Sequence, residues 1–260
     1  MQARAVGHHR IAPSASTASA VAALYVDERD RDTPGVLLPH PEVHLVVRFG
    51  PSARDGVDAH AFGPRQRVHR KLLHGGHQTV MARLRLGAPE AVLGVPGSAI
   101  AGRVVALEDL WGEVTARRLY GRLAEARNAF DAAAILDSAI AERPAVAGGR
   151  LARARLALDA AERLTSAHVN AVAVDIGMSE RHLRRVFREA VGVSPKAFAK
   201  ITRFHRALRA ARVEGQTSWA SIAAAAGYYD QAHLIAEFRA IAGVTPRALL
   251  GELRMVPSVG

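Results

Sequence analysis

The amino-acid sequence predicts an α+β protein of two domains, a β-rich N-terminal domain followed by an all-α C-terminal domain. Three observations predict this architecture: the length of 260 residues, a change in apolar patterning along the chain, and a repeat inside the C-terminal half. Apolar residues make up 49% and charged residues 23% of the chain. These values are close to globular averages and argue against a wholly disordered or fibrous protein.

We divide the chain into three parts. A disordered tail is expected over residues 1–19, a sensor or dimerisation domain over 20–146, and a helical domain over 147–257. The tail has arginines ahead of an Ala-rich stretch, as signal peptides do, but Pro13 and several Ser and Thr residues interrupt its apolar core. A tail is therefore favoured over a secretion signal. The boundary falls at Ala147-Gly148-Gly149, whose composition is typical of a linker.

The β-rich half consists of short apolar runs bounded by Gly and Pro. Val43 to Phe49 is predicted as a strand, and Thr79 to Leu86 alternates apolar and polar residues as a half-buried strand does. Further apolar runs at 91–95 and 104–107 complete a small barrel or sandwich. Residues 113–143 are rich in Ala, Leu, Arg and Glu and predict one or two trailing helices that end near Pro144.

Basic residues are in excess. Lys plus Arg is 35 and Asp plus Glu is 24, so the net charge is 35 − 24 = +11, which favours nucleic acid or an anionic membrane as partner. Residues 163–214 hold eleven basic and four acidic residues, a net +7, whereas residues 215–260 hold three of each. Cysteine is absent, which excludes disulfides, thiol catalysis and zinc fingers. No apolar stretch reaches the roughly 18 residues that a membrane span requires.

The C-terminal half contains an internal repeat. Ala173-x-x-x-Gly177 recurs as Ala223-x-x-x-Gly227, and each copy continues with Leu, Phe-Arg and Gly-Val-Ser/Thr-Pro at matching spacing. The small residue lets two helices approach, the glycine permits a sharp left-handed turn, and the next helix packs its Leu and Phe inward. Ser194-Pro195 and Thr245-Pro246 are then an N-cap followed by an N1 proline. Each copy predicts a helix-turn-helix.

The second helix of each copy has an outward face. In the helix predicted over 179–190, four arginines share one side at i, i+3, i+4 and i+7, with few acids to pair them: Arg181, Arg184, Arg185 and Arg188. Arg contacts guanine bidentately and also binds phosphate. In the helix predicted over 230–242, the outward residues are Gln231, Ala232, His233, Ala236 and Arg239. Because two of these are alanines, we expect uneven base recognition by the two copies.

One continuous helix from Ser194 to Val213 is predicted between the copies. Its roughly eighteen residues give a rod of about 27 Å, comparable to the roughly 34 Å between successive major-groove faces of B-DNA. Phe198, Ile201, His205 and Leu208 form its buried stripe, with His205 expected as a packed core residue. Lys196, Lys200, Arg203 and Arg206 form a basic stripe that is predicted to touch the phosphate backbone.

Residues 150–255 resemble the DNA-binding domain of AraC/XylS-type transcription regulators, through the paired motifs, Gly-Tyr-Tyr-Asp-Gln-Ala-His-Leu at 227–234 and Gly-Val-Thr-Pro at 243–246. The resemblance implies two recognition helices in adjacent major grooves. It assigns base-facing sites to Arg181, Arg184, Arg185, Gln231, Ala232, His233 and Ala236. Many members have Arg where this chain has Ala236, which puts strong base contacts by the second copy in doubt. Residues 83–111 resemble, more loosely, the cupin-like β-barrel that often precedes this domain as a sensor.

Histidines are abundant in the N-terminal half, at His40, His44, His60, His69, His74 and His77. A cupin metal centre would use imidazoles on adjacent strands. The spacing matches no standard metal pattern and no Glu or Asp stands beside them as a ligand, so we expect neither metal nor cofactor; a pH-sensitive or anion-binding surface is the alternative. Trp111 is expected in the core, with stacking on an aromatic effector as the alternative.

The sequence therefore predicts a sequence-specific regulator that binds double-stranded DNA and is not an enzyme, since no acid/base pair, nucleophile motif or phosphate loop is found. Expected partners are RNA polymerase, a small-molecule effector and a second copy, with no membrane, and the expected location is the cytoplasm in association with the nucleoid. A cupin-type metalloenzyme with an accessory helical domain is the alternative. A non-specific DNA-compacting protein would need basic charge on both copies.

Overall fold

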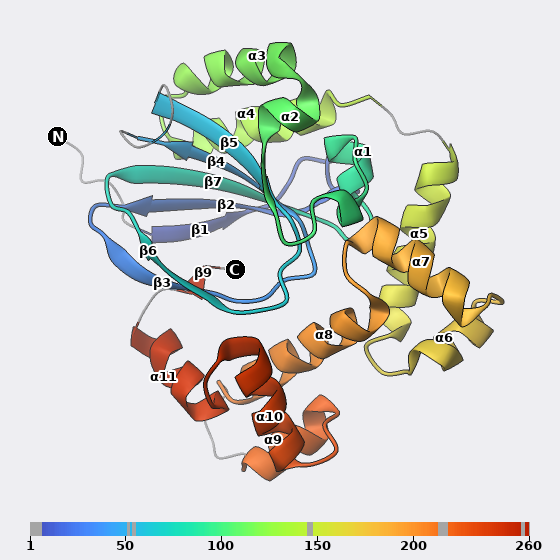
Figure 1. Ribbon diagram of the computed structural model, residues 1–260. Helices are drawn as coiled ribbons and strands as arrows, with labels where there is room; N and C mark the ends of the chain where they lie inside the picture. The colour runs from blue at the N-terminus through green and yellow to red at the C-terminus, as the bar shows by residue number, and fades with distance from the viewer. Residues whose placement is uncertain are drawn as a thin grey trace.

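The computed structural model describes residues 7–50, 53, 56–144, 148–212, 218–255 and 258–259. An antiparallel sheet region with trailing helices precedes an all-α domain (Figure 1), as the sequence predicts. Within the described residues, no helix has the length and apolar character needed to cross a membrane.

Two sheets form the N-terminal domain. The larger has six antiparallel strands in the order β1-β2-β7-β4-β5-β8, and the smaller has the order β6-β3-β9. The strands are β1 (Gly7–Ile11), β2 (Val21–Arg29), β3 (Thr33–Leu37), β4 (His44–Phe49), β5 (Val57–Phe62), β6 (His69–Leu73), β7 (His77–Leu84), β8 (Val104–Ala106) and β9 (Ser258–Val259). Strands β2 and β7 pair in the larger sheet, and β3 and β6, which adjoin them in the chain, pair in the smaller sheet. The two pairs therefore form one two-stranded ribbon that passes from one sheet to the other.

The core lies between the six-stranded sheet and the trailing helices. Leu45, Val47, Val80 and Ala82, on β4 and β7, are each 0% exposed and pack with buried residues of the helices. The helices of this domain are α1 (Pro89–Leu93), α2 (Leu107–Trp111), α3 (Glu113–Ala124) and α4 (Ala129–Ala141). Figure 1 shows α3 and α4 beside this sheet, away from the three-stranded sheet.

Two expectations for this domain differ from the structure, and a third, the core position of Trp111, is confirmed. The apolar run at 91–95 lies mostly in α1, because Pro89 opens a helical turn there that Gly94 ends with φ +79°. Trp111 is a core residue, 6% exposed, and its Nε1 donates to the carbonyl oxygen of Val92 at 2.9 Å. We expected a disordered tail over residues 1–19; within it, Gly7–Ile11 forms β1 on β2, and Thr17 is buried and donates to Asp137. Residues 1–6 lie outside the described residues.

The C-terminal domain has seven helices in its described residues. They are α5 (Gly148–Arg163), α6 (Val169–Asp175), α7 (Glu180–Val191), α8 (Pro195–Ala210), α9 (Trp219–Ala226), α10 (Gln231–Ala242) and α11 (Pro246–Met255). The expected linker is only partly seen: residue 147 lies outside the described residues, and Gly148 and Gly149 begin α5. The long helix ends at Ala210 rather than Val213, which shortens it to about 24 Å at the usual helical rise.

The sheet domain contacts both halves of the helical domain. Near α7, the backbone of Gly97 lies so close to the end of the helix that a Cβ at this position would lie 2.7 Å from the carbonyl oxygen of Ala190. Near α10, the backbone nitrogen of Val68 donates to the carbonyl oxygen of Ile241 at 2.9 Å. These contacts fix the helical domain against the sheets from both ends of α8.

Candidate nucleic-acid interface

The repeat folds as two helix-turn-helix units, α6–α7 (the first unit) and α9–α10 (the second unit). Gly177 and Gly227 turn the chain at φ +74° and +86°, values that favour glycine. Ser179 and Asp230 then cap the next helices: the Ser179 hydroxyl accepts from the backbone nitrogen of His182 at 3.3 Å, and the Asp230 carboxylate accepts from that of His233 at 2.7 Å. The predicted starts of both recognition helices are confirmed to within one residue.

Apolar side chains anchor each recognition helix on its inner side. Leu183 and Phe187 in α7, and Leu234 and Phe238 in α10, are all 0% exposed. The ring of Phe204 in α8 packs at a tilt against that of Phe238, with ring centroids 4.5 Å apart. The sequence analysis did not single out Phe204, although it lies at helical spacing from Ile201 and Leu208 on the predicted buried stripe.

The outer face of α7 carries the four predicted arginines, all exposed. Two of them are paired within the helix: the Nε of Arg184 donates to Glu180 at 2.8 Å, and Arg185 contacts Glu189 at 3.2 Å. Among the described residues, Arg181 and Arg188 have no ion pair. The expectation of few pairing acids is therefore wrong for half of the face, since helical spacing of four residues brings Glu180 and Glu189 to two of the arginines.

The outer face of α10 is nearly neutral, as predicted. Its exposed residues include Gln231, Ala232, His233, Ala236 and Arg239. The Nδ1 of His233 accepts from the backbone nitrogen of Tyr229 at 3.4 Å, so this imidazole turns back toward the preceding turn. Tyr229 is 92% exposed at the start of the helix. It was missed as a candidate contact, although it belongs to the Gly-Tyr-Tyr motif.

A groove of about 830 Å³ runs between the two units along α8. Its cationic walls are Arg184, Lys196, Lys200, Arg203 and Arg206, and its acidic walls are Glu180 and Glu237. Lys196 is exposed and Lys200 is partly exposed, as the predicted phosphate-contacting stripe requires.

Arg203, which the sequence predicts to touch the phosphate backbone, also makes contacts inside the protein. Its Nη2 donates to Glu237 of α10 at 2.8 Å, and its guanidinium lies 5.3 Å from the ring centroid of Tyr228. Glu237 is buried at 8% exposure. Burial and the neighbouring Glu237 carboxylate raise the pKa of Tyr228. Arg203 thus links α8 to the second unit, and Arg206 donates to the carbonyl oxygen of Thr165, between α5 and α6, at 2.7 Å.

The N-terminal histidines separate into different places. The ring centroids of His40 and His44 lie 5.3 Å apart, and the ring of His40 stacks on that of His205 of α8 with centroids 5.2 Å apart. The Nε2 of His205 lies 2.6 Å from the carbonyl oxygen of Pro39. His205 is therefore a packed residue, as predicted, but it packs against the sheet domain. His60 lies beside Asp58, His74 and His77 lie near one another on the β6–β7 turn, and His69 is exposed.

Burial lowers the pKa of two histidines in this contact. Burial and the nearby His40 lower the pKa of His44 to about 3 and that of His205 to about 4. Burial also raises the pKa of Glu42, but its bond and charge interaction with His40 outweigh that effect and lower it to about 2. Glu42 is an acidic neighbour that the sequence analysis overlooked, 3.7 Å from His40. Across the described residues, no group of three or more His, Cys, Asp or Glu side chains is arranged to hold a metal ion.

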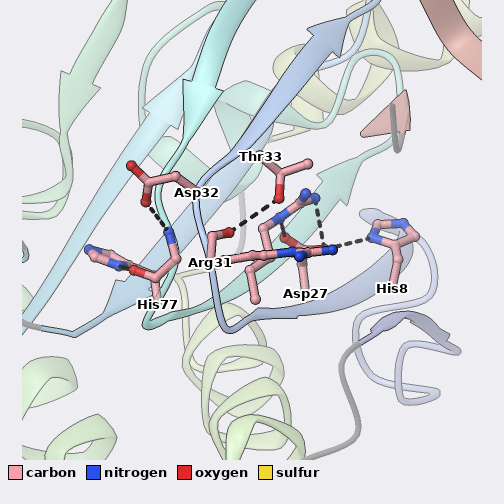
Figure 2. A network of polar contacts seen from close by, with 8 residues as sticks. His8, Asp27, Arg31, Asp32, Thr33 and His77 are labelled. Atoms are coloured by element: carbon pink, nitrogen blue, oxygen red, sulfur yellow. Dashed lines mark hydrogen bonds and ion pairs between the residues drawn. The ribbon is translucent and has the colours of Figure 1, made fainter. Parts of the chain in front are cut away.

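A cavity of about 160 Å³ lies between the two sheets. Asp27 on its wall accepts two bonds from Arg29 and lies beside His8 (Figure 2); burial raises the pKa of Asp27, and the contacts with His8 and Arg29 lower it overall. Arg48 forms a bidentate pair with Asp58, both bonds 2.8 Å long. Figure 2 also shows Asp32 at the nearby turn, where it accepts from the backbone nitrogen of Gly75 at 2.8 Å.

Two capped helix-turn-helix units joined by one helix, with their recognition helices facing solvent, define a DNA-binding domain. Residues 172–252 match the model of a protein family described as a helix-turn-helix domain. This segment is a helix-turn-helix domain of the AraC type. No curated protein matches the chain.

Several solved structures are similar to parts of the chain. A DNA-binding transcriptional dual regulator from Escherichia coli K-12 is 24% identical over 38% of this chain and 89% of its own, with a TM-score of 0.32. The DNA-binding domain of AdpA, in complex with a target DNA, is 26% identical over 39% and 92%, with a TM-score of 0.34. Fatty-acid-bound ToxT from Vibrio cholerae is 9% identical over 91% and 95%, with a TM-score of 0.45. None of these TM-scores reaches 0.5, so the assignment depends on the helix-turn-helix match.

Proposed function

We propose that the chain regulates transcription by inserting α7 and α10 into adjacent major grooves of one operator. The observation that carries this proposal is the pair of solvent-facing helices, each anchored on its inner side by a buried Leu and a buried Phe and joined to the other by α8. A rod of about 24 Å brings two such helices to a separation comparable to one turn of B-DNA.

The two units contribute unequally. Arg181 and Arg188 offer unpaired guanidinium groups to bases or phosphates, and Lys196 and Lys200 add backbone contacts from the groove. The second unit offers Gln231, exposed Tyr229 and Arg239. We therefore infer that the first unit supplies most of the affinity and of the base recognition, and that the second unit makes fewer base contacts.

Modulation by a small-molecule effector is supported by the position of β3 and β6, whose side chains contact both the second unit and the cavity between the sheets. Successive residues of a strand point to opposite faces. Val36 and Leu38 belong to the apolar cluster of the second unit, whereas Leu37 between them lines the cavity. Arg70 binds the second unit while its neighbour Lys71 lines the cavity. A ligand that moved these strands would move α10 and α11 with them. Contact with RNA polymerase and dimerisation through the trailing helices stay predictions.

Selection of DNA from a random pool by the full chain tests the function. We expect an operator with two conserved blocks about one helical turn apart. Replacing Arg181 and Arg188 by Ala should weaken binding by roughly 1–3 kcal/mol for each base contact and degrade the block read by α7. Arg118→Ala, on α3, removes one exposed positive charge outside the helical domain and is the control. Selection of a single block, or none, would contradict insertion of both helices.

A further inference from the structure

The cavity between the sheets combines apolar walls with a group of cations. Tyr25, Val46 and Met81 form an apolar floor on the six-stranded sheet, and Leu37 faces it from the three-stranded sheet. An apolar cavity of roughly 150 Å³ holds a benzene-sized molecule. At about 160 Å³, this one matches the apolar body of a ligand with a single ring or a short branched chain.

Four cationic side chains line the same cavity, and two of them lack an acidic partner. Arg29 and Arg48 are paired with Asp27 and Asp58. The side chains of Arg65 and Lys71 form no ion pair or hydrogen bond with any part of the chain that the structure describes. Partial burial and repulsion from Arg65, Arg48 and Arg29 lower the pKa of Lys71, so these positive charges interact with one another across the cavity. Uncompensated like charges at a cavity wall favour an anion.

A third polar group converges on the same place. His44 lines the cavity, is 4% exposed, and its Nε2 has no hydrogen-bond partner among the described residues. Buried polar atoms are nearly always satisfied, and an orphan of this kind is consistent with a ligand or an ordered water. Arg65 contributes to the lowered pKa of His44 as well as to that of Lys71, which places Arg65 near both.

We propose that this cavity binds a small organic carboxylate whose apolar body is about the size of one ring. The carboxylate lies between Arg65 and Lys71 and accepts from the neutral His44 ring, and the apolar body packs on Tyr25, Val46 and Met81. Arg is suited to this role because its planar fork matches a carboxylate bidentately. The inference rests on the proposed function, in which this cavity is the effector site, and it adds the chemical class of the effector.

Calorimetric titration of the full chain, without DNA and at constant ionic strength, tests the site. The probes are butanoate, cyclohexanecarboxylate and benzoate, each beside its neutral amide. We expect saturable binding of one ring carboxylate per chain, and binding of its amide that is weaker by about tenfold or more, because a hydrogen bond to a charged group is lost. Arg65→Gln and Lys71→Gln should each weaken the carboxylate by about tenfold and leave the amide unchanged.

Arg67→Gln is the matched control, because Arg67 is exposed, two residues from Arg65, and not on the cavity wall. Equal affinity for acid and amide, no binding by any probe, or unchanged binding by the folded R65Q/K71Q variant would overturn the proposal. Operator selection distinguishes this failure from failure of the proposed function: a chain that selects its operator but binds no carboxylate loses only the ligand class, and a chain that binds the carboxylate but selects no operator loses the DNA role.

Discussion

At the scale of single residues, the most consequential contact is the bridge between Arg203 and Glu237. The periodicity of α8 places Arg203 on a basic stripe, and that stripe exists, but the partner is 34 positions away on another helix. A pattern of neighbouring residues in the sequence cannot predict such a contact. The available sequence signal for this contact was the position of Glu237, a carboxylate on the inward side of the predicted recognition helix between Leu234 and Ile241.

Glu237→Ala should destabilise the protein by about 3 kcal/mol, because it leaves the partly buried Arg203 without its carboxylate. Urea unfolding of the full chain measures this change. The matched control is Glu180→Ala, which removes a carboxylate from an exposed i,i+4 pair and should cost less than about 1 kcal/mol. Equal losses in the two variants would show that the Arg203 bridge is not a buried linkage.

The histidine contact between His44, His40 and His205 predicts acid sensitivity. The folded-state pKa values of His44 and His205, about 3 and about 4, lie below the unfolded value near 6.5. The unfolded chain therefore binds more protons, and stability should fall as pH drops through 6.5. Glu42, with a pKa lowered to about 2, loses its contribution only below its unfolded value near 4.5.

The window between about pH 6.5 and about pH 4.5 therefore isolates the histidines. Urea midpoints measured across it should decline for the natural chain and decline less for His44→Gln, which cannot take up a proton. His69→Gln, at an exposed position, should follow the natural chain. Identical pH profiles for all three proteins would show that protonation of His44 is not linked to folding.

At the scale of elements, caps and turns predicted the helical domain well because they are local. Ser194 and Thr245 each accept the expected backbone hydrogen bond, and Gly177 and Gly227 take positive φ. Strand β1 was missed for the opposite reason: its pairing with β2 is a contact between segments, and Gly7-His8-His9-Arg10-Ile11 carries no strong apolar alternation. The acidic pairing on α7 is local and could have been predicted from spacing alone.

That pairing gives a prediction for the recognition helix. Glu180→Gln releases Arg184 from its i,i+4 partner and removes one negative charge from the face that we propose meets DNA. Because such a pair is worth only about 0.3–0.5 kcal/mol, operator affinity should rise by roughly twofold or more, and the salt dependence should become steeper. Fluorescence anisotropy at two salt concentrations measures both.

Glu113→Gln on α3 is the matched control, because Glu113 also pairs with an arginine four residues later. It should leave operator affinity unchanged. If both substitutions raise affinity equally, the effect is one of net charge and does not come from the α7 face.

At the scale of the whole molecule, the sheet domain contacts the helical domain at several separate places. The turn at Gly97 meets the end of α7, the Pro39 carbonyl meets His205 in the middle of α8, and β6 meets α10 and α11. The sequence separates the domains and could not predict this, because every contact joins residues from opposite halves.

Arg70 of β6 makes side-chain hydrogen bonds to both α10 and α11. Its Nη1 donates to the carbonyl oxygen of Ala242 at 2.9 Å, and its Nε donates to Glu252 of α11 at 2.8 Å. Arg70→Ala should loosen the second unit by about 1 kcal/mol, since the contact is partly exposed. Hydrogen exchange followed by mass spectrometry should show roughly fivefold faster exchange in α10 and α11 and no change in α6 and α7. Arg67→Ala removes a nearby exposed charge and should change neither region. Faster exchange in both units would instead mean that the helical domain responds as one body, and the sheets would then regulate DNA binding by moving both recognition helices together.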